Sequence, residues 1–369
     1  MDEIPFLKPR LVSKDALTGY LEQIDATRIY SNHGPLNKRV EERILRRFFS
    51  DEGAVVTVNN ATTGLMLAIM QVKRAGKYAL MPSFTFSATP LSAMWCGLEP
   101  YFIDIDPERW CLNERQLEEA LQKLGDEVAV VVPYAAFGAE LNLEYYESLR
   151  RSGVPVVIDA ASSFGCMRDD QFGRGFKGAV VFSFHATKLF GIGEGGLIYS
   201  ADETLIHRLR QSSNFGFDQN RESRQIGLNG KVSEYAAAIA LATLEVVDEK
   251  IIARERIADW YRAELQDAGM LFKGWKLQEG GGKIPYQFFP LLCPPKHDHR
   301  FYLSKLQAAG IQARTYFSPS CHEQPLFQRS PHSDLSVTED VCRRILSLPV
   351  WEDIEQAQVQ RIVRCLADE

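Results

Sequence analysis

Short apolar runs recur between residues 40 and 200, separated by longer segments that mix apolar and polar positions. The runs are rich in β-branched residues and carry few charges, which is typical of strands buried on both faces of a sheet. Helix-forming segments lie between them, for example 61–76 and 113–125. This alternation predicts the α/β class, with a mostly parallel sheet covered by helices on both faces. The expected strands are 54–58, 77–81, 99–104, 128–134, 154–160 and 178–184.

The last third of the chain has a different pattern. Residues 235–269 are helix-forming throughout, and they change from an alanine-rich apolar half to a charged amphipathic half. We expect this helix to lead out of a large domain spanning residues 1–245 into a smaller α+β domain spanning residues 246–369. In the smaller domain the pattern predicts strands at 284–293 and 311–317, and helices at 302–310 and 353–366.

Composition and charge narrow the class of partner. The 42 basic and 48 acidic residues are interspersed, and the formal net charge is −6, so no basic stripe predicts nucleic-acid binding. The chain has no apolar stretch of membrane-spanning length, and its first residues do not resemble a signal peptide, so we expect a cytoplasmic protein without a membrane partner. The segment His297–His299 lacks further ligands at zinc-site spacing, so no metal site is expected.

Polar and aromatic residues of possible chemical use follow several of the expected strands. In open α/β sheets, ligands bind at the carboxyl ends of the strands, where helix N-termini supply unpaired N–H groups. Each residue also has a structural interpretation in isolation: a helix cap, a turn, core packing or a solvated charge. The candidates are Ala61, Thr62 and Thr63 at a helix start, Phe84 and Phe86, Asp159, and Lys188 before a glycine-rich loop.

The combination favours a functional interpretation over the structural one. Pyridoxal 5'-phosphate (PLP) needs a lysine for its Schiff base, an acid for its ring nitrogen, donors for its phosphate and a flat partner for its ring. Lys188, Asp159, Thr62 and Phe86 supply these four groups, each after its own strand. The sequence therefore predicts a PLP site.

The chain also resembles the DegT family of nucleotide-sugar aminotransferases along nearly its whole length. The resemblance lies in the order and spacing of "NNATTGL", "PSFTFSATP", "VIDAASSFG", "SFHATK…EGG", "GLNGKVSE" and "GIQARTYFSPSCHEQP". It implies the aspartate-aminotransferase (type I) fold, in which a large domain with a mostly parallel seven-stranded sheet precedes a smaller α+β domain. It also implies PLP as the cofactor.

The resemblance assigns roles to individual residues. Lys188 matches the Schiff-base lysine, Asp159 the acid paired with the pyridinium nitrogen, and Phe86 the aromatic residue that stacks on the ring. Asn229 matches an asparagine that reaches the cofactor phosphate of a neighbouring subunit, which implies a homodimer with shared active sites. The other implied cofactor contacts are Ala61, Thr62 and Ser183 at the phosphate, and Ser162 near the phenolic oxygen. The family commonly has glycine at the position of Ala61, and glutamine or histidine at that of Ser162.

For the substrate, the form "SFH-x-TK…EGG" resembles that of enzymes that aminate C4 of a 4-keto-6-deoxy sugar, whereas many C3-specific relatives carry "SFYP-x-K". The resemblance thus implies glutamate as amino donor and dTDP-4-keto-6-deoxyglucose as the first candidate acceptor, in the biosynthesis of a surface glycan such as the O-antigen of lipopolysaccharide. His185 would lie at the reacting centre, in substrate binding or proton handling or as a structural hydrogen-bond partner. The remaining expected substrate residues are Tyr30, Asn32, Arg314, Tyr316 and His322.

Three alternatives remain at this point. A C3 aminotransferase would use the same cofactor residues on another sugar. Some relatives are dehydratases in which histidine replaces the Schiff-base lysine, and the presence of Lys188 counts against that reaction here. A non-catalytic sugar-binding or regulatory protein of the same fold is the third alternative.

Overall fold

The computed structural model describes residues 3–165, 171–280 and 284–367. Within these residues the central sheet has seven strands, in a four-stranded part with the order β1-β7-β6-β5 and a three-stranded part with the order β3-β2-β4. A parallel bridge between Val131 and Val156 joins the two parts along β4 and β5. The strands are β1 (Ala54–Val58), β2 (Tyr78–Pro82), β3 (Glu99–Ile103), β4 (Val128–Val131), β5 (Val157–Asp159), β6 (Ala179–Ser183) and β7 (Gly196–Ser200).

The sheet is mostly parallel, as predicted, and β7 is the exception. It runs antiparallel to both β1 and β6, and it was not among the six runs expected to form strands. Its direction agrees with the link 184–195, which contains no helix among its residues, because a parallel crossover usually passes through a helix. The loop that carries Lys188 therefore lies between two adjacent, hydrogen-bonded strands.

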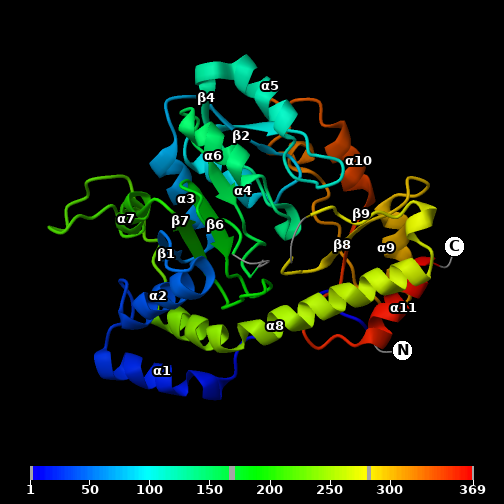
Figure 1. Cartoon of the computed structure of the whole chain (residues 1–369), viewed down its shortest axis with the longest axis horizontal. Helices are drawn as coiled ribbons and strands as arrows, with labels where there is room; N and C mark the ends of the chain where they lie inside the picture. Colours follow the sequence, from blue (N-terminus) through cyan, green and yellow to red (C-terminus); the bar gives the residue numbers. More distant parts are fainter. Residues whose placement is uncertain (1–2, 166–170, 281–283, 368–369) are drawn as a thin grey trace.

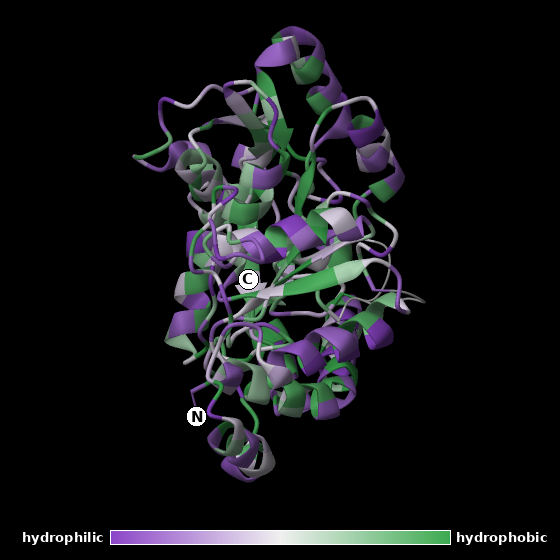
Figure 2. Ribbon diagram, turned by 90° about the vertical axis from the view of Figure 1, so that its left-hand side faces the viewer, coloured by the Kyte–Doolittle hydropathy of each residue, from purple (hydrophilic) through white to green (hydrophobic). Residues whose placement is uncertain are grey.

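Helices cover both faces of the sheet (Figure 1). Alternate residues of the strands enter two separate apolar cores, as in β6, where Val180 and Phe182 belong to one core and Ala179 and Val181 to the other. Figure 2 shows the strands as mostly hydrophobic and the outer helices as alternately hydrophilic and hydrophobic. The helices of this part are α1 (Lys14–Thr27), α2 (Pro35–Phe49), α3 (Ala61–Val72), α4 (Ala88–Trp95), α5 (Glu114–Leu124), α6 (Leu143–Arg151) and α7 (Glu203–Ser212), with short 3-10 turns at Gly125–Glu127 and Ala136–Gly138.

Helix α8 (Glu234–Asp267) runs without a break beneath both parts of the molecule (Figure 1). Its residues up to Val247 pack in one core of the sheet, and those from Ile257 onward pack in a third core of the C-terminal part. The predicted boundary at 245/246 lies inside this helix. We propose that the two domains divide along α8, between Val247 and Ile257.

Among the described residues, the C-terminal part has two strands, of which β9 was not predicted. β8 (Phe289–Leu292) pairs antiparallel with β9 (Ile345–Leu348), so the strand expected at 284–293 is shorter. The strand expected at 311–317 does not form, because Ile311 pairs with Ile4 and Arg314 pairs with Ser347, which are separate partners. The other elements are the helices α9 (His299–Ala308), α10 (Ser336–Arg344) and α11 (Gln356–Ala367), and 3-10 turns at Leu271–Lys273 and Cys321–Glu323.

The described residues lack two kinds of feature. None of the helices in these residues is long and apolar enough to cross a membrane. Nor do the described residues contain a group of three or more His, Cys, Asp or Glu side chains placed to hold a metal ion. In the segment His297–His299, the ring of His297 stacks on Phe301 at a centroid distance of 4.1 Å.

Candidate active site

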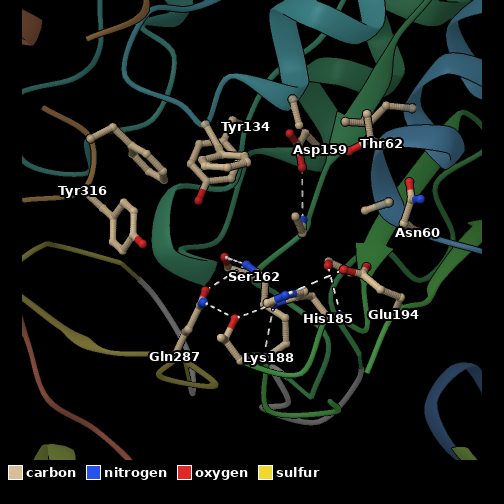
Figure 3. A pocket seen from close by; sticks show the side chains of 18 of the residues that line it. Asn60, Thr62, Tyr134, Asp159, Ser162, His185, Lys188, Glu194, Gln287 and Tyr316 are labelled. Carbon is tan, nitrogen blue, oxygen red and sulfur yellow. Dashed lines mark hydrogen bonds and ion pairs between the residues drawn. The ribbon is translucent and has the colours of Figure 1, made fainter. Parts of the chain in front are cut away.

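A cavity of about 590 Å³ opens at the carboxyl ends of the sheet strands (Figure 3). The start of α3 and the segments that follow β2, β4, β5 and β6 reach it from the sheet, and residues 287–288 and 316–317 close it from the C-terminal part. This is the edge at which an open α/β sheet binds ligands.

The first turn of α3 lines one end of this cavity. Asn60 is the N-cap, and its Oδ1 accepts a hydrogen bond of 2.8 Å from the amide of Thr63. The amides of Ala61 and Thr62 have no partner inside the helix, as is general for a first turn, and they stand at the positive end of the helix dipole. Gly196 keeps this region open, since a Cβ there would lie 3.0 Å from the Ala61 nitrogen. The arrangement is a ready anion site.

Asp159 ends β5 and is buried, with 3% of its surface exposed. Its Oδ2 accepts a hydrogen bond of 2.6 Å from Thr89 Oγ1, and its Oδ1 accepts one of 3.1 Å from the Ala161 amide. Burial raises the pKa of this carboxyl above its ordinary value. A buried carboxylate held by two neutral donors favours a cationic partner in the cavity that it lines.

Phe84 and Phe86 have different environments although they are two residues apart. Phe84 is fully buried and packs edge-on against Phe137 and Phe317. Phe86 is 58% exposed and lines the cavity. Core packing therefore describes Phe84, whereas Phe86 offers an aromatic ring to a ligand.

Lys188 extends into the cavity from the loop after β6 (Figure 3). Its Nζ donates hydrogen bonds to Ser162 Oγ at 3.0 Å and to Gln287 Oε1 at 2.8 Å. Desolvation by burial lowers the pKa of the amine to about 8, although the Asp159 carboxylate acts in the opposite direction. A sizeable fraction of the amine is thus neutral near physiological pH, which suits a base.

His185 and Glu194 lie at the rim of the cavity. The Nδ1 atom of His185 is 2.9 Å from Thr187 Oγ1, and its Nε2 atom is 3.8 Å from Glu194 Oε1. Thr187 in turn accepts a hydrogen bond of 2.8 Å from Gln287 Nε2. His185 therefore has hydrogen-bond partners on its own loop and remains exposed toward the cavity.

The structure brings most of the predicted site residues together and leaves five outside the cavity. Tyr30 and Asn32 line a separate cavity of about 750 Å³. Asn229 is exposed on the surface, where its Oδ1 accepts a hydrogen bond from Lys231, and Arg314 packs over the ring of Phe6. His322 contacts Ser83 through Nδ1 at 2.8 Å. The predicted residues that line the main cavity are Ala61, Thr62, Phe86, Asp159, Ser162, Ser183, His185, Lys188 and Tyr316.

Several residues of the site were not identified from the sequence. Thr89 binds Asp159, and Thr187 and Gln287 form a hydrogen-bonded group with Lys188. Thr89 and Thr187 lie inside motifs that were identified, so their proximity to Phe86 and Lys188 was the available signal. The only sequence signal for Gln287 was its amide side chain within an otherwise apolar and aromatic run, "IPYQFFPLLC".

Comparisons with known proteins agree on one family. The model of the DegT/DnrJ/EryC1/StrS aminotransferase family matches residues 13–367. A Bacillus cereus protein assigned as a PLP-dependent aminotransferase has a crystal structure that superposes with a TM-score of 0.98, at 50% identity over all of both chains. DesI, crystallised in the presence of its TDP-sugar product, superposes with a TM-score of 0.89, at 31% identity over 100% of this chain and 93% of its own.

A curated relative adds a named product. The dTDP-4-amino-4,6-dideoxy-D-glucose transaminase of Shigella dysenteriae is 28% identical to this chain, and the match covers 98% of this chain and 97% of that protein. The predicted type I fold is confirmed by the two superposed structures.

Proposed function

We propose a reaction for this chain, which belongs to the DegT/DnrJ/EryC1/StrS aminotransferase family and is a PLP-dependent nucleotide-sugar aminotransferase. The proposed reaction moves an amino group from glutamate to C4 of a nucleotide-linked 4-keto-6-deoxy sugar. The first candidate acceptor is dTDP-4-keto-6-deoxy-D-glucose. The observation that carries the proposal is that Lys188, Asp159 and the first turn of α3 line one cavity.

The residues of the cavity fit PLP. The open amides at the start of α3 suit its phosphate, with Thr62 and Ser183 as further donors, and Gly196 leaves that end uncovered. The buried carboxylate of Asp159 suits a protonated ring nitrogen, and the exposed ring of Phe86 suits a flat heterocycle. When bound, the cofactor supplies a sink for the negative charge that develops on the carbon that loses a proton.

Lys188 would act as the base and acid of the reaction. Its Nζ takes the proton from Cα of the amino donor in the first half of the reaction, and it delivers a proton to the sugar carbon in the second half. The lowered pKa of about 8 suits both tasks, because the neutral and the protonated amine are then both populated near pH 7 to 8.

Asp159 and Phe86 would act on the ring. Asp159 offsets the charge of the protonated ring nitrogen, and the hydroxyl of Thr89 fixes the carboxylate at Oδ2. Phe86, whose exposed ring lines the cavity, would stack on the ring and exclude water from it. The hydroxyl of Ser162, which accepts a hydrogen bond from Lys188 Nζ, would be available to the phenolic oxygen of the ring.

Two observations support C4 as the site of amination. His185 and the "SFH-x-TK" form resemble those of C4 enzymes, and His185 lies at the rim of the cavity beside Glu194. The name of the Shigella dysenteriae relative also places the new amine at C4. The nucleotide would extend past Tyr316, which lines the same cavity.

We also propose that two copies of the chain share their active sites. Tyr30, Asn32 and Asn229 lie outside the cavity of their own chain, and the Tyr30 carbonyl accepts a hydrogen bond from the amide of Glu234, close to Asn229 in sequence. These residues would serve the site of the second copy, while Arg314 and His322 remain predicted substrate contacts. Light scattering of the purified protein is expected to give the mass of two chains; the mass of one chain would contradict the sharing.

Phe86 and Phe84 offer a matched pair of substitutions. Phe86→Ala is expected to raise the dissociation constant of PLP about 3- to 10-fold, because aromatic stacking contributes about 0.5–1.5 kcal/mol, and to leave the apoprotein stable. Phe84→Ala is expected to destabilise the apoprotein by about 3–5 kcal/mol, because it empties a fully buried position. Cofactor titration and chemical unfolding measure the two effects, and equal loss of stability in both variants would contradict the assignment of Phe86.

A substrate panel tests the reaction. The holoenzyme is incubated with glutamate and dTDP-, UDP- or GDP-linked 4-keto-6-deoxy sugars, and a 3-keto sugar nucleotide is included. We expect a 4-amino product with the dTDP-linked sugar, identified by mass spectrometry and NMR. Amination of the 3-keto sugar alone would favour the C3 alternative, loss of water without amine transfer would favour the dehydratase, and no turnover with any member would sink the proposal.

A further inference from the structure

Gln287 connects the catalytic lysine to the C-terminal part of the chain (Figure 3). It precedes β8, is half-buried and lines the cavity. Its amide makes two contacts, accepting a hydrogen bond from Lys188 Nζ at 2.8 Å and donating one to Thr187 Oγ1 at 2.8 Å. One side chain thus contacts both the amine and the loop that carries it.

The neighbours of Thr187 fix which end of the amide faces the lysine. The backbone N–H of Thr187 donates to His185 Nδ1 at 3.3 Å, so Nδ1 is an acceptor, and the Thr187 hydroxyl donates its own proton to the same atom at 2.9 Å. The hydroxyl oxygen then accepts from Gln287 Nε2. Turning the amide over would set its Oε1 against the Thr187 oxygen, whose proton is already donated to His185, so two acceptors would face each other.

The orientation of the Gln287 amide determines the direction of the lone pair on Lys188 Nζ. A neutral amine has two N–H bonds and one lone pair. Ser162 Oγ and Gln287 Oε1 accept the two N–H bonds of Lys188, so the remaining tetrahedral position on the nitrogen is held in one direction. A base with a fixed lone pair avoids the loss of rate that misalignment causes.

The segment that carries Gln287 is itself anchored. The carbonyl of Tyr286 accepts a hydrogen bond of 3.0 Å from Arg254 Nη1, and Arg254 pairs with Glu352 at 3.0 Å. Both charged side chains are nearly buried, so the pair is weakly screened by solvent. The residue before Gln287 is therefore tied to a nearly buried ion pair between α8 and the C-terminal part.

We propose that Gln287 is a positioning residue that, together with Ser162, orients the amine of Lys188, and that Thr187 holds the Gln287 amide in the required sense. The proposal rests on the role of Lys188 proposed above. It assigns to the C-terminal part of the chain a direct influence on the base of the reaction.

The first test measures the lysine without substrate. Full-length apoprotein is treated with acetic anhydride across a pH series, and the acetylation of Lys188 is quantified by peptide mass spectrometry. Gln287→Glu is expected to raise the labelling midpoint by about 1–3 pH units, because a carboxylate near the amine favours its charged form. The nearly isosteric Gln287→Met is expected to lower the midpoint, because it removes an acceptor.

The second test measures proton transfer with glutamate alone. In the holoenzyme, Gln287→Met is expected to lower the single-turnover rate with glutamate about 10- to 100-fold, as misplacement of a catalytic group does, and to change the apparent Kd of glutamate less than about twofold. Thr187→Val is expected to lower the rate in the same way, whereas Thr187→Ser, which keeps the hydroxyl, restores it.

The outcomes test the positioning role of Gln287 separately from the proposed sugar acceptor. Wild-type labelling midpoints and rates in both Gln287→Met and Thr187→Val would overturn it, as would a rise in Kd without a change in rate. Neither test uses a sugar, so altered midpoints with an unproductive sugar panel would leave the positioning role intact and remove only the proposed acceptor. If Gln287→Met fails to fold, as judged by circular dichroism, Thr187→Val and Thr187→Ser decide the question.

Discussion

Lys188→Ala is expected to lower turnover at least about 10⁴-fold, because it removes both the proposed attachment point of the cofactor and the group proposed to move the proton. The chain should remain folded, since the side chain is half-buried and its two partners, Ser162 and Gln287, face the cavity. Steady-state assay of the variant with glutamate and the productive sugar nucleotide checks this. Activity within tenfold of wild type would refute the role of Lys188.

Lys188→Met is the control for stability, because it keeps a long unbranched side chain and removes the amine with its charge and its hydrogen bonds to Ser162 and Gln287. The folded-state pKa of Lys188 is about 8, against 10.5 as its ordinary value. The unfolded chain therefore binds more protons than the folded chain between these two values, and the contribution of Lys188 to stability rises with pH across that window. Wild-type apoprotein should gain unfolding free energy relative to Lys188→Met between pH 8 and pH 10.5. A constant difference across this range would contradict the desolvated amine.

From the sequence alone we could predict those site residues that lie at the ends of individual strands. Asp159, Ser183 and Lys188 follow buried runs that form real strands, so their meeting at one edge of the sheet follows from parallel topology. Gln287 was not predictable in this way, because its segment belongs to the C-terminal part of the chain and its approach to Lys188 depends on how the two parts pack along α8. Contacts between distant segments leave no periodic signal in the chain.

The errors in the predicted fold have related causes. β7 has an apolar sequence but no helix before it, so the alternating pattern of strands and helices does not indicate it. Residues 311–317 have a strand-like composition, yet Ile311 and Arg314 pair with different neighbours, and a continuous ladder does not form. Strand propensity describes a residue's fit to a sheet surface, and it does not specify whether a partner is present.

Asp104 and Asp159 also show that the sequence does not specify the partners of a residue. They supply a matched pair of variants. Both follow sheet strands and both are buried. Asp104 accepts hydrogen bonds from the amides of Val337 and Thr338 at 3.0 and 2.7 Å, so it caps the start of α10. Asp159 instead lines the cavity. Asp104→Asn is therefore expected to cost about 2 kcal/mol of stability, since hydrogen bonds to a charged group are lost, and to leave kcat unchanged.

Asp159→Asn is expected to lower turnover and to stabilise the apoprotein, in contrast to Asp104→Asn. Turnover should fall about 10²–10³-fold, because a preorganised charge beside the reacting system is lost. The apoprotein should become more stable at neutral pH, since burial raises the pKa of Asp159 and the ionised form carries a desolvation cost in the folded state. Thr89 tolerates the change, because its hydroxyl can accept from the new amide and donate to Thr85, 2.8 Å away.

The direction in which the stability difference between Asp159→Asn and wild type changes with pH shows whether desolvation of Asp159 causes it. With its pKa raised on folding, Asp159 binds more protons in the folded chain than in the unfolded chain, so its contribution to stability falls as pH rises above the ordinary carboxyl range. The advantage of the Asp159→Asn apoprotein should accordingly shrink as pH is lowered toward 4 in thermal unfolding experiments. An apoprotein that is less stable than wild type at pH 8, as expected for Asp104→Asn, would show that Asp159 is a structural cap and not a group held ready for a cationic partner.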